Sequence, residues 1–131
     1  MLDPQVLDEA LKPFQRAYVV IEDPMYQGVD PFILNKLSRE IAFDSDRKYE
    51  EHLWDCEDIA RSLVHHCKAT LKSYKYSPAI GVIHYVTNRG ESHVVNVGFT
   101  VKGELYFFEP QTHHRIHLSK LELLSIRFIQ I

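Results

Sequence analysis

The hydrophobic pattern of this chain changes at Pro78, and this change constrains the fold more than any other feature of the sequence. Before Pro78, the apolar residues between Ile59 and Leu71 recur at the spacing that places them on one face of a helix. After Pro78, segments such as HVVNVGFTV and ELYFFE are rich in β-branched and aromatic residues, which predicts strands joined by turns. The sequence therefore predicts an α+β fold. Helices of the N-terminal half, with a central Cys-bearing helix, would pack on a C-terminal antiparallel sheet.

Helix starts in the first half are marked by capping residues. Asp3-Pro4 and Asp30-Pro31 each combine an N-cap with a proline at the first helical position, and predict helices that end near Leu11 and Phe43. Asp55 is the expected N-cap of the longer helix, which should run from about Cys56 to Ser73. The segment 17–24 between these helices predicts a short strand or an extended arm.

Length, charge and cysteine content limit the class of protein. The chain has 131 residues, which predicts a single domain over residues 1–131. The net charge of −3 and the absence of a basic run argue against nucleic acid or an acidic membrane as partners. The first residues, MLDPQVLDEALK, carry acidic groups and no apolar stretch, so they are not expected to form a signal peptide, and no apolar run approaches roughly 18 residues. Cys56 and Cys67 share one predicted helix and are not expected to bond, which favours a cytoplasmic location.

Cys56 lies in the first turn of a predicted helix, where unpaired N–H groups favour negative charge on a thiol. His93 opens a predicted strand, and Glu109 and Gln111 follow at the end of the next strand. A thiol, an imidazole and a carboxylate or amide are the nucleophile, base and orienting group of thiol-dependent acyl transfer. The alternative is that Cys56 is a small buried residue without chemistry.

The order of these residues resembles the papain-like superfamily, which includes transglutaminase-like proteins. The segments WDCEDIARSL, HVVNVGF and YFFEPQT, between Trp54 and Thr112, are most similar to the C-terminal domain of certain chimeric mushroom lectins. The resemblance implies a calcium-dependent cysteine protease with Cys56 as nucleophile, His93 as base and Glu109 as orienting residue. The papain pattern CGSCW is absent from this chain.

The expected strand register conflicts with this set of residues. A two-residue turn at Lys102-Gly103 would place Glu109 opposite Asn96, so that His93 and Glu109 would point to opposite faces of the sheet. A bulge at Gly103 would shift the register and bring the two side chains to one face. Gln111 is the alternative orienting residue.

The acids near Cys56 suggest a cation. Asp58, Asn96 and Glu109 offer the oxygen ligands that calcium prefers, and the resemblance implies a metal ion beside the active site. No cofactor is predicted to be required, and calcium is the candidate ion, with Asp58 and Asn96 as its ligands. In the alternative interpretation, Asp55 caps the helix while Glu57 and Asp58 stabilise its first turn.

The sequence thus predicts a thiol-dependent hydrolase or acyl transferase that acts on peptide-type bonds of a peptide or protein substrate. Two alternatives stay open. One is a non-enzymatic binding module on the same fold, in which Cys56 is inert. The other is a domain in which Asp58, Asn96 and Glu109 hold a divalent cation without catalysis. Nothing in the sequence fixes the oligomeric state.

Overall fold

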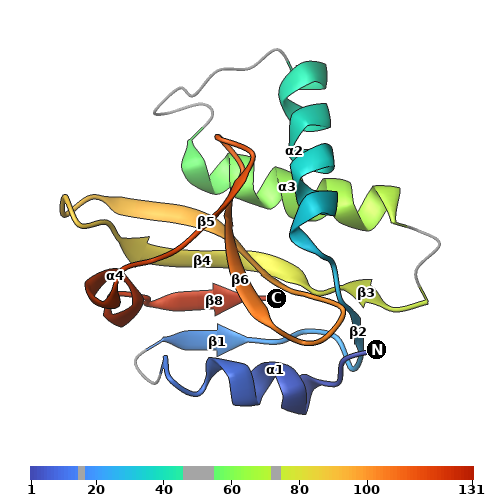
Figure 1. Ribbon diagram of the computed structural model, residues 1–131, viewed down its shortest axis with the longest axis horizontal. Helices are drawn as coiled ribbons and strands as arrows, with labels where there is room; N and C mark the ends of the chain where they lie inside the picture. The colour runs from blue at the N-terminus through green and yellow to red at the C-terminus, as the bar shows by residue number, and fades with distance from the viewer. Residues whose placement is uncertain (15–16, 46–54, 72–74) are drawn as a thin grey trace.

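The computed structural model describes residues 1–14, 17–45, 55–71 and 75–131 (Figure 1). Its centre is a six-stranded sheet with the strand order β1-β8-β4-β5-β6-β7, and a separate two-stranded sheet pairs β2 with β3. The strands are β1 (Tyr18–Val20), β2 (Tyr26–Gln27), β3 (Ser77–Pro78), β4 (Ile80–Val86), β5 (Ser92–Phe99), β6 (Leu105–Glu109), β7 (His114–Ile116) and β8 (Phe128–Gln130). The helices are α1 (Pro4–Leu11), α2 (Pro31–Ser45), α3 (Cys56–Thr70) and α4 (Lys120–Leu124).

The predicted α+β papain-like fold, with an antiparallel sheet confined to the C-terminal half, is wrong. The sheet is mixed, because β1 pairs in parallel with β8 while the other neighbouring strands are antiparallel. It also takes strands from both halves of the chain, and strands rather than helices form the centre of the molecule. The sequence missed this because β1 has only three residues, and its partner lies at the far end of the chain.

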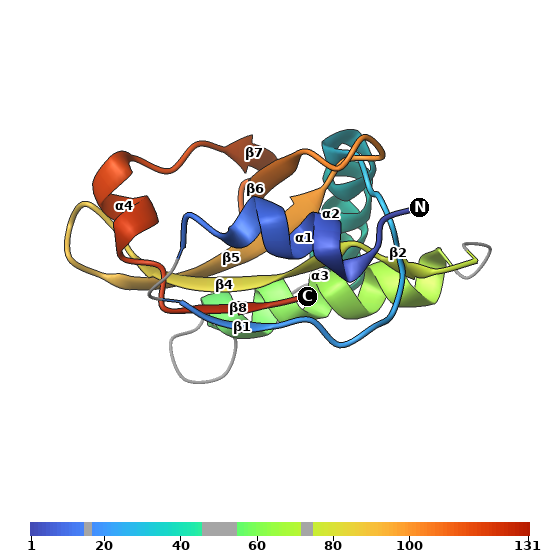
Figure 2. The same cartoon turned by 90° about the horizontal axis from the view of Figure 1, so that it is seen from below.

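The helices cover the two faces of the sheet unequally (Figure 2). Alternation along β5 sends Val95 and Val97 to the face that packs against Leu7 and Leu11 of α1. The opposite face carries α3, where Ala60 packs against Val82 and Val94. Helix α2 packs against α3 and completes this second layer with Leu34 and Leu37. All the apolar residues named in this paragraph are buried, and their burial holds the helices on the two faces of the sheet.

The two long hairpins are closed by the same five-residue loop. Thr87 and Glu91 begin and end the β4–β5 loop, and Thr100 and Glu104 do the same between β5 and β6. In each loop the first residue donates its N–H to the carbonyl of the last, and its hydroxyl accepts a bond from the last residue's N–H. The fourth residue is a glycine with positive φ, 81° at Gly90 and 85° at Gly103. The shared pattern T-x-x-G-E therefore fixes the register of both hairpins.

Helix α3 begins as the sequence predicts. Asp55 accepts a hydrogen bond from the N–H of Asp58 at 3.1 Å, and the Asp58 carboxylate reaches back to the N–H of Asp55 at 3.5 Å. This reciprocal pair is a capping box, which defines Cys56 as the first helical residue. None of the described helices combines the length and hydrophobicity needed to cross a membrane.

Candidate functional site

Cys56 lies at the N-terminus of α3, half-buried, with the rest of the helix resting on β4 and β5. Asn96 fixes this placement from the middle of β5. Its fully buried amide donates to the carbonyl of Ala60 at 2.9 Å and to the carbonyl of Gly81 at 3.1 Å. One side chain on β5 therefore ties α3 and β4 together, one helical turn below Cys56.

His93 and Glu109 meet because the register differs from the expected one by a single residue. Phe99 pairs with Leu105 and Asn96 with Phe108, so continuing this register places Glu109 opposite Val95 instead of Asn96. His93 is two residues from Val95 and therefore shares its face. The remaining diagonal offset is within reach of long side chains, and His93 Nε2 lies 2.8 Å from Glu109 Oε1. The shift comes from the five-residue loop and its bulge-forming Gly103, and the expectation of a two-residue turn was wrong.

The side chain of Cys56 lies beside the imidazole of His93 and raises its pKa. Nε2 is the ring nitrogen that faces Glu109. Cys56 and the hydrogen-bonded Glu109 raise the pKa of His93 to about 10, against a weaker opposing effect of burial. The structure therefore brings together three of the predicted residues, with a protonated imidazole between a thiol and a carboxylate at neutral pH.

Gln111, the alternative orienting residue, is not part of this arrangement. It is exposed in the turn after β6, and it forms no hydrogen bond with His93 in the described structure. Trp54, at the start of the segment on which the resemblance rests, lies outside the described residues.

Two residues of this site were not predicted from the sequence. Tyr85 lies opposite His93 on β4, and the two rings meet edge to face with their centroids 5.8 Å apart. Burial raises the pKa of Tyr85 to about 12. His84 belongs to the same strand, and burial lowers the pKa of its imidazole, so that the ring is neutral at pH 7. Tyr85 and His84 reach the site because β4 pairs with β5. The sequence predicted strands in this region but not which of their residues lie opposite each other.

A cleft of about 350 Å³ opens beside Cys56. It lies between the start of α3, the β4–β5 hairpin and the residues that lead into β8. The residues that line it are Asp55, Cys56, Glu57, His84, Tyr85, Val86, Ser92, His93, Val94, Arg127 and Phe128. The buried Nε2 of His84 has no hydrogen-bond partner among the described residues, so the cleft holds an unused polar group.

The predicted calcium ligands have other roles in the structure. Asp58 is exposed and belongs to the capping box. Asn96 is fully buried, and its side-chain amide donates hydrogen bonds to two backbone carbonyls. Across the described ranges, no group of three or more His, Cys, Asp or Glu side chains is placed to hold a metal ion. The geometry thus agrees with the alternative interpretation of the acids as helix-start residues, and calcium binding stays a prediction.

Comparisons with known proteins give structural matches only. No protein-family model matches the chain, and no curated protein matches it. One similar structure is a PSL1a–E64 complex, with a TM-score of 0.80 and 14% identity over 99% of this chain. Another is Polyporus squamosus lectin bound to the human-type influenza-binding epitope Neu5Acα2-6Galβ1-4GlcNAc, with a TM-score of 0.74 and 12% identity over 97% of this chain. The chain spans about half the length of these two chains, 51% and 48% respectively.

These matches correct the family and function expected from the sequence. The similar structures are lectin structures, so the assignment to the papain-like and transglutaminase-like cysteine proteases is wrong. The predicted activity of a thiol-dependent hydrolase or acyl transferase on peptide-type bonds rested on that assignment and is also wrong. At these identities the comparison shows a shared fold, and the alternative of a non-enzymatic binding module agrees with it better.

Proposed function

We propose that this chain is a binding module that holds a saccharide in the cleft beside Cys56. The observation that carries the proposal is the cleft itself, whose volume of about 350 Å³ falls at the lower end of the roughly 300–1,000 Å³ range of small-molecule sites. A saccharide takes the place of the predicted peptide or protein substrate. The saccharide bound to the second similar lectin supports this choice of ligand class.

The lining of the cleft suits a ligand with both hydroxyl groups and apolar ring faces. Phe128 stacks on the exposed ring of Tyr18, with the centroids 6.1 Å apart and the planes at 18°. His84 meets the edge of Phe128 at 5.3 Å and, being neutral, can either donate to or accept from a hydroxyl group. An aromatic surface beside a few polar groups is the usual make-up of a small-molecule site.

The test is a titration of the ¹⁵N-labelled chain with Neu5Acα2-6Galβ1-4GlcNAc and with its separate sugars, followed by NMR. We expect saturable shifts at Ser92, His84 and Phe128. His84→Phe keeps an aromatic ring but removes the polar atoms, and should weaken binding about tenfold, or about 1.4 kcal/mol. Phe32→Ala, which removes an exposed ring on α2 outside the cleft, is the control and should bind as the unmodified chain does. Shifts that do not saturate, or that lie outside the cleft, would refute the proposal.

A second candidate function follows from the position of Cys56 beside His93. The thiol faces an imidazole that stays protonated at neutral pH, and such a cation favours negative charge on sulfur. We propose Cys56 as a nucleophile that captures an electrophilic ligand in this cleft, with protonated His93 as its charged partner and Glu109 as the residue that orients His93. In that step a sulfur–carbon bond forms while the bond from that carbon to its leaving group breaks, as with the iodide of iodoacetamide. The leaving group takes the electron pair of the broken bond, and the thiol proton passes to solvent. We also propose a reducing, cytoplasmic setting, in which both thiols stay free.

Alkylation separates the two candidates. Iodoacetamide and E64 should each label Cys56 near neutral pH, and mass spectrometry identifies the modified residue. Cys67 is the internal control, because it is fully buried and its pKa is raised to about 12 by burial. His93→Gln should slow the labelling of Cys56 at least tenfold. Equal, slow labelling of both cysteines would refute the nucleophile without affecting the saccharide proposal.

A further inference from the structure

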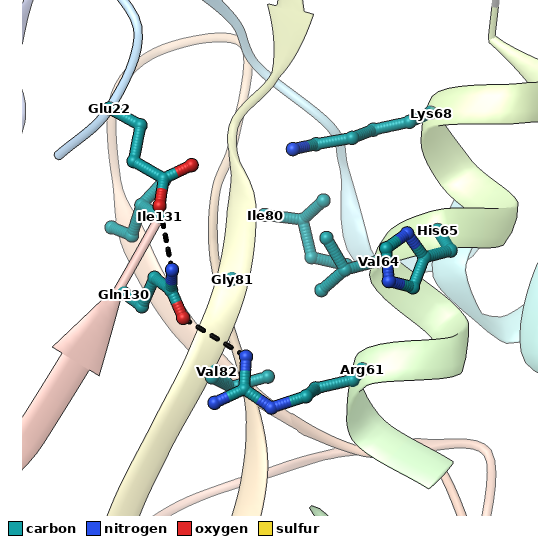
Figure 3. Close-up of a pocket in the computed structure, with 10 residues that line it drawn as sticks. All are labelled: Glu22, Arg61, Val64, His65, Lys68, Ile80, Gly81, Val82, Gln130 and Ile131. Atoms are coloured by element: carbon teal, nitrogen blue, oxygen red, sulfur yellow. Dashed lines mark hydrogen bonds between the residues drawn. The ribbon is translucent and has the colours of Figure 1, made fainter. Parts of the chain in front are cut away.

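A second pocket, separate from the cleft beside Cys56, lies between α3 and the strands β4 and β8 (Figure 3). We call it the Arg61 pocket, and its volume is about 140 Å³. The residues that line it are Glu22, Arg61, Val64, His65, Lys68, Ile80, Gly81, Val82, Gln130 and Ile131. None of these residues lines the cleft beside Cys56. The two cavities lie along different parts of the same helix, α3.

The basic groups of this pocket come from one side of α3. Arg61, His65 and Lys68 are spaced by four and three residues, which places them one above another along the helix. Their side chains extend from α3 toward β4 in Figure 3. His65 and Lys68 form no hydrogen bond or ion pair with any residue that the structure describes. Their polar ends are therefore free to meet a ligand.

A chain of hydrogen bonds holds the guanidinium of Arg61 at the pocket. Arg61 Nη1 donates to Gln130 Oε1 at 3.0 Å, and Gln130 Nε2 donates to Glu22 Oε1 at 2.7 Å. On its other side, Arg61 Nε donates to Glu57 at 3.0 Å. These two bonds use part of the five N–H donors of the guanidinium. Arg61 is thus fixed in place while it keeps donors for a further oxygen ligand.

The charge and size of the pocket select the ligand class. Two cations, Arg61 and Lys68, line the pocket. Arg61 pairs with Glu57, whereas Lys68 forms no ion pair with a described residue, so its charge favours an anionic ligand. Val64, Ile80 and Val82 supply an apolar wall for a short carbon chain. A water molecule takes up about 30 Å³ of liquid, so the pocket has room for a group the size of a few waters. The carbonyl of Ile131 already accepts hydrogen bonds from Glu22 N and Tyr26 Oη.

From this arrangement we propose that the Arg61 pocket binds the carboxylate of a small organic acid, with Arg61 and Lys68 as its cationic contacts and the apolar wall against its carbon chain. The carboxylate can come from a free short-chain acid or from an acidic sugar, and both present the same group to a guanidinium. This site is independent of the saccharide cleft and does not rest on its function.

The experiment is an NMR titration of the ¹⁵N-labelled chain at constant ionic strength, with sodium butyrate as the free acid and N-acetylneuraminic acid as the acidic sugar. Butyramide and the methyl ester of the sugar are the uncharged controls. We expect butyrate to give saturable shifts at Arg61, Lys68 and Gln130, and butyramide to give none there. Binding of both acids, but of neither neutral control, would show that the pocket recognises the carboxylate and not the rest of the molecule. Binding of only one acid would identify the source.

Two lysine variants test the contacts. Lys68→Gln should raise the Kd for butyrate at least fivefold, because it removes a cation at the pocket. Lys102→Gln removes an equally exposed charge in the β5–β6 loop, far along the chain, and should leave the Kd unchanged. Both lysines are exposed, so neither variant should disturb folding. If butyrate and butyramide bind alike, or if both variants bind butyrate as the unmodified chain does, the proposal is wrong.

Discussion

His93 is the residue on which the candidate site depends, because its ring contacts both the thiol and the carboxylate. Neither contact is a property of the local sequence. His93 opens a strand in a segment that would suit any half-buried histidine, and only the pairing of β5 with β6 brings Glu109 to it. The residue types were therefore predictable, but their contact depended on a register that the sequence did not fix.

The raised pKa of His93 predicts how stability varies with pH. The pKa rises from 6.5 to about 10 on folding, so protonated His93 stabilises the folded state. This contribution should be complete below about pH 6.5 and should be lost as the pH rises toward 10. His93→Gln should be less stable than the unmodified chain at low pH, and the difference should shrink with increasing pH. Urea unfolding of both proteins at about pH 6, 8 and 10 measures it. A difference that stays constant or grows over this range would contradict the assigned hydrogen bonds.

At the scale of elements, the sequence predicts helices well and strand register poorly. Caps and apolar spacing placed α1 and α3 at their observed starts, because both signals are local. The predicted β5–β6 register was wrong because Lys102 and Gly103 were expected to form a two-residue turn. The repeated T-x-x-G-E pattern, at Thr87–Glu91 and Thr100–Glu104, was the signal that could have corrected it. Two hairpins with the same loop sequence are expected to have the same loop geometry.

This loop geometry gives a prediction for Gly103. Its φ of 85° is left-handed, so Gly103→Ala should lower the free energy of unfolding by about 1–2 kcal/mol. Strain at this position also acts on the hairpin that brings Glu109 to His93. We therefore expect the variant to lower the pKa of His93, measured by NMR titration of the imidazole.

Gly90→Ala is the matched control for Gly103→Ala. Its φ of 81° carries the same backbone cost, and its added methyl group has open space around it, whereas at Gly103 it would meet Val6 Cγ1 at 3.3 Å. The Gly90 variant should lose a similar amount of stability and change the pKa of His93 less than Gly103→Ala does, since the β4–β5 loop does not position Glu109. If both variants change the pKa equally, the β5–β6 loop has no special role in the site.

At the scale of the whole molecule, the sheet joins segments from the two ends of the described chain. β1 pairs with β8, and β2 pairs with β3, in both cases in parallel. Such pairings need long connections and leave no local pattern, which explains why the sequence predicted only the hairpin-linked strands. The apolar faces of the strands were predictable from alternation, but the order of the strands in the sheet was not. The mixed sheet is the part of the fold that the sequence could not supply.

Tyr26 connects these distant segments and provides a test of how far they stabilise the molecule. Its buried hydroxyl accepts hydrogen bonds from the N–H groups of Glu22 at 3.1 Å and Asp23 at 2.9 Å, and donates to the carbonyl of Ile131 at 3.1 Å. Tyr26→Phe keeps the ring in the core but removes all three bonds. The N–H of Asp23 then loses its partner, whereas the N–H of Glu22 and the carbonyl of Ile131 stay bonded to each other. The variant should lower the free energy of unfolding by about 1–2 kcal/mol and the Tm by roughly 4–8 °C. Tyr18→Phe is the control, since Tyr18 is 69% exposed, and should change stability by less than about 0.5 kcal/mol. Equal Tm values for the two variants would show that the hydroxyl of Tyr26 adds no net stability, and that apolar burial alone holds β2 and the β8 end together.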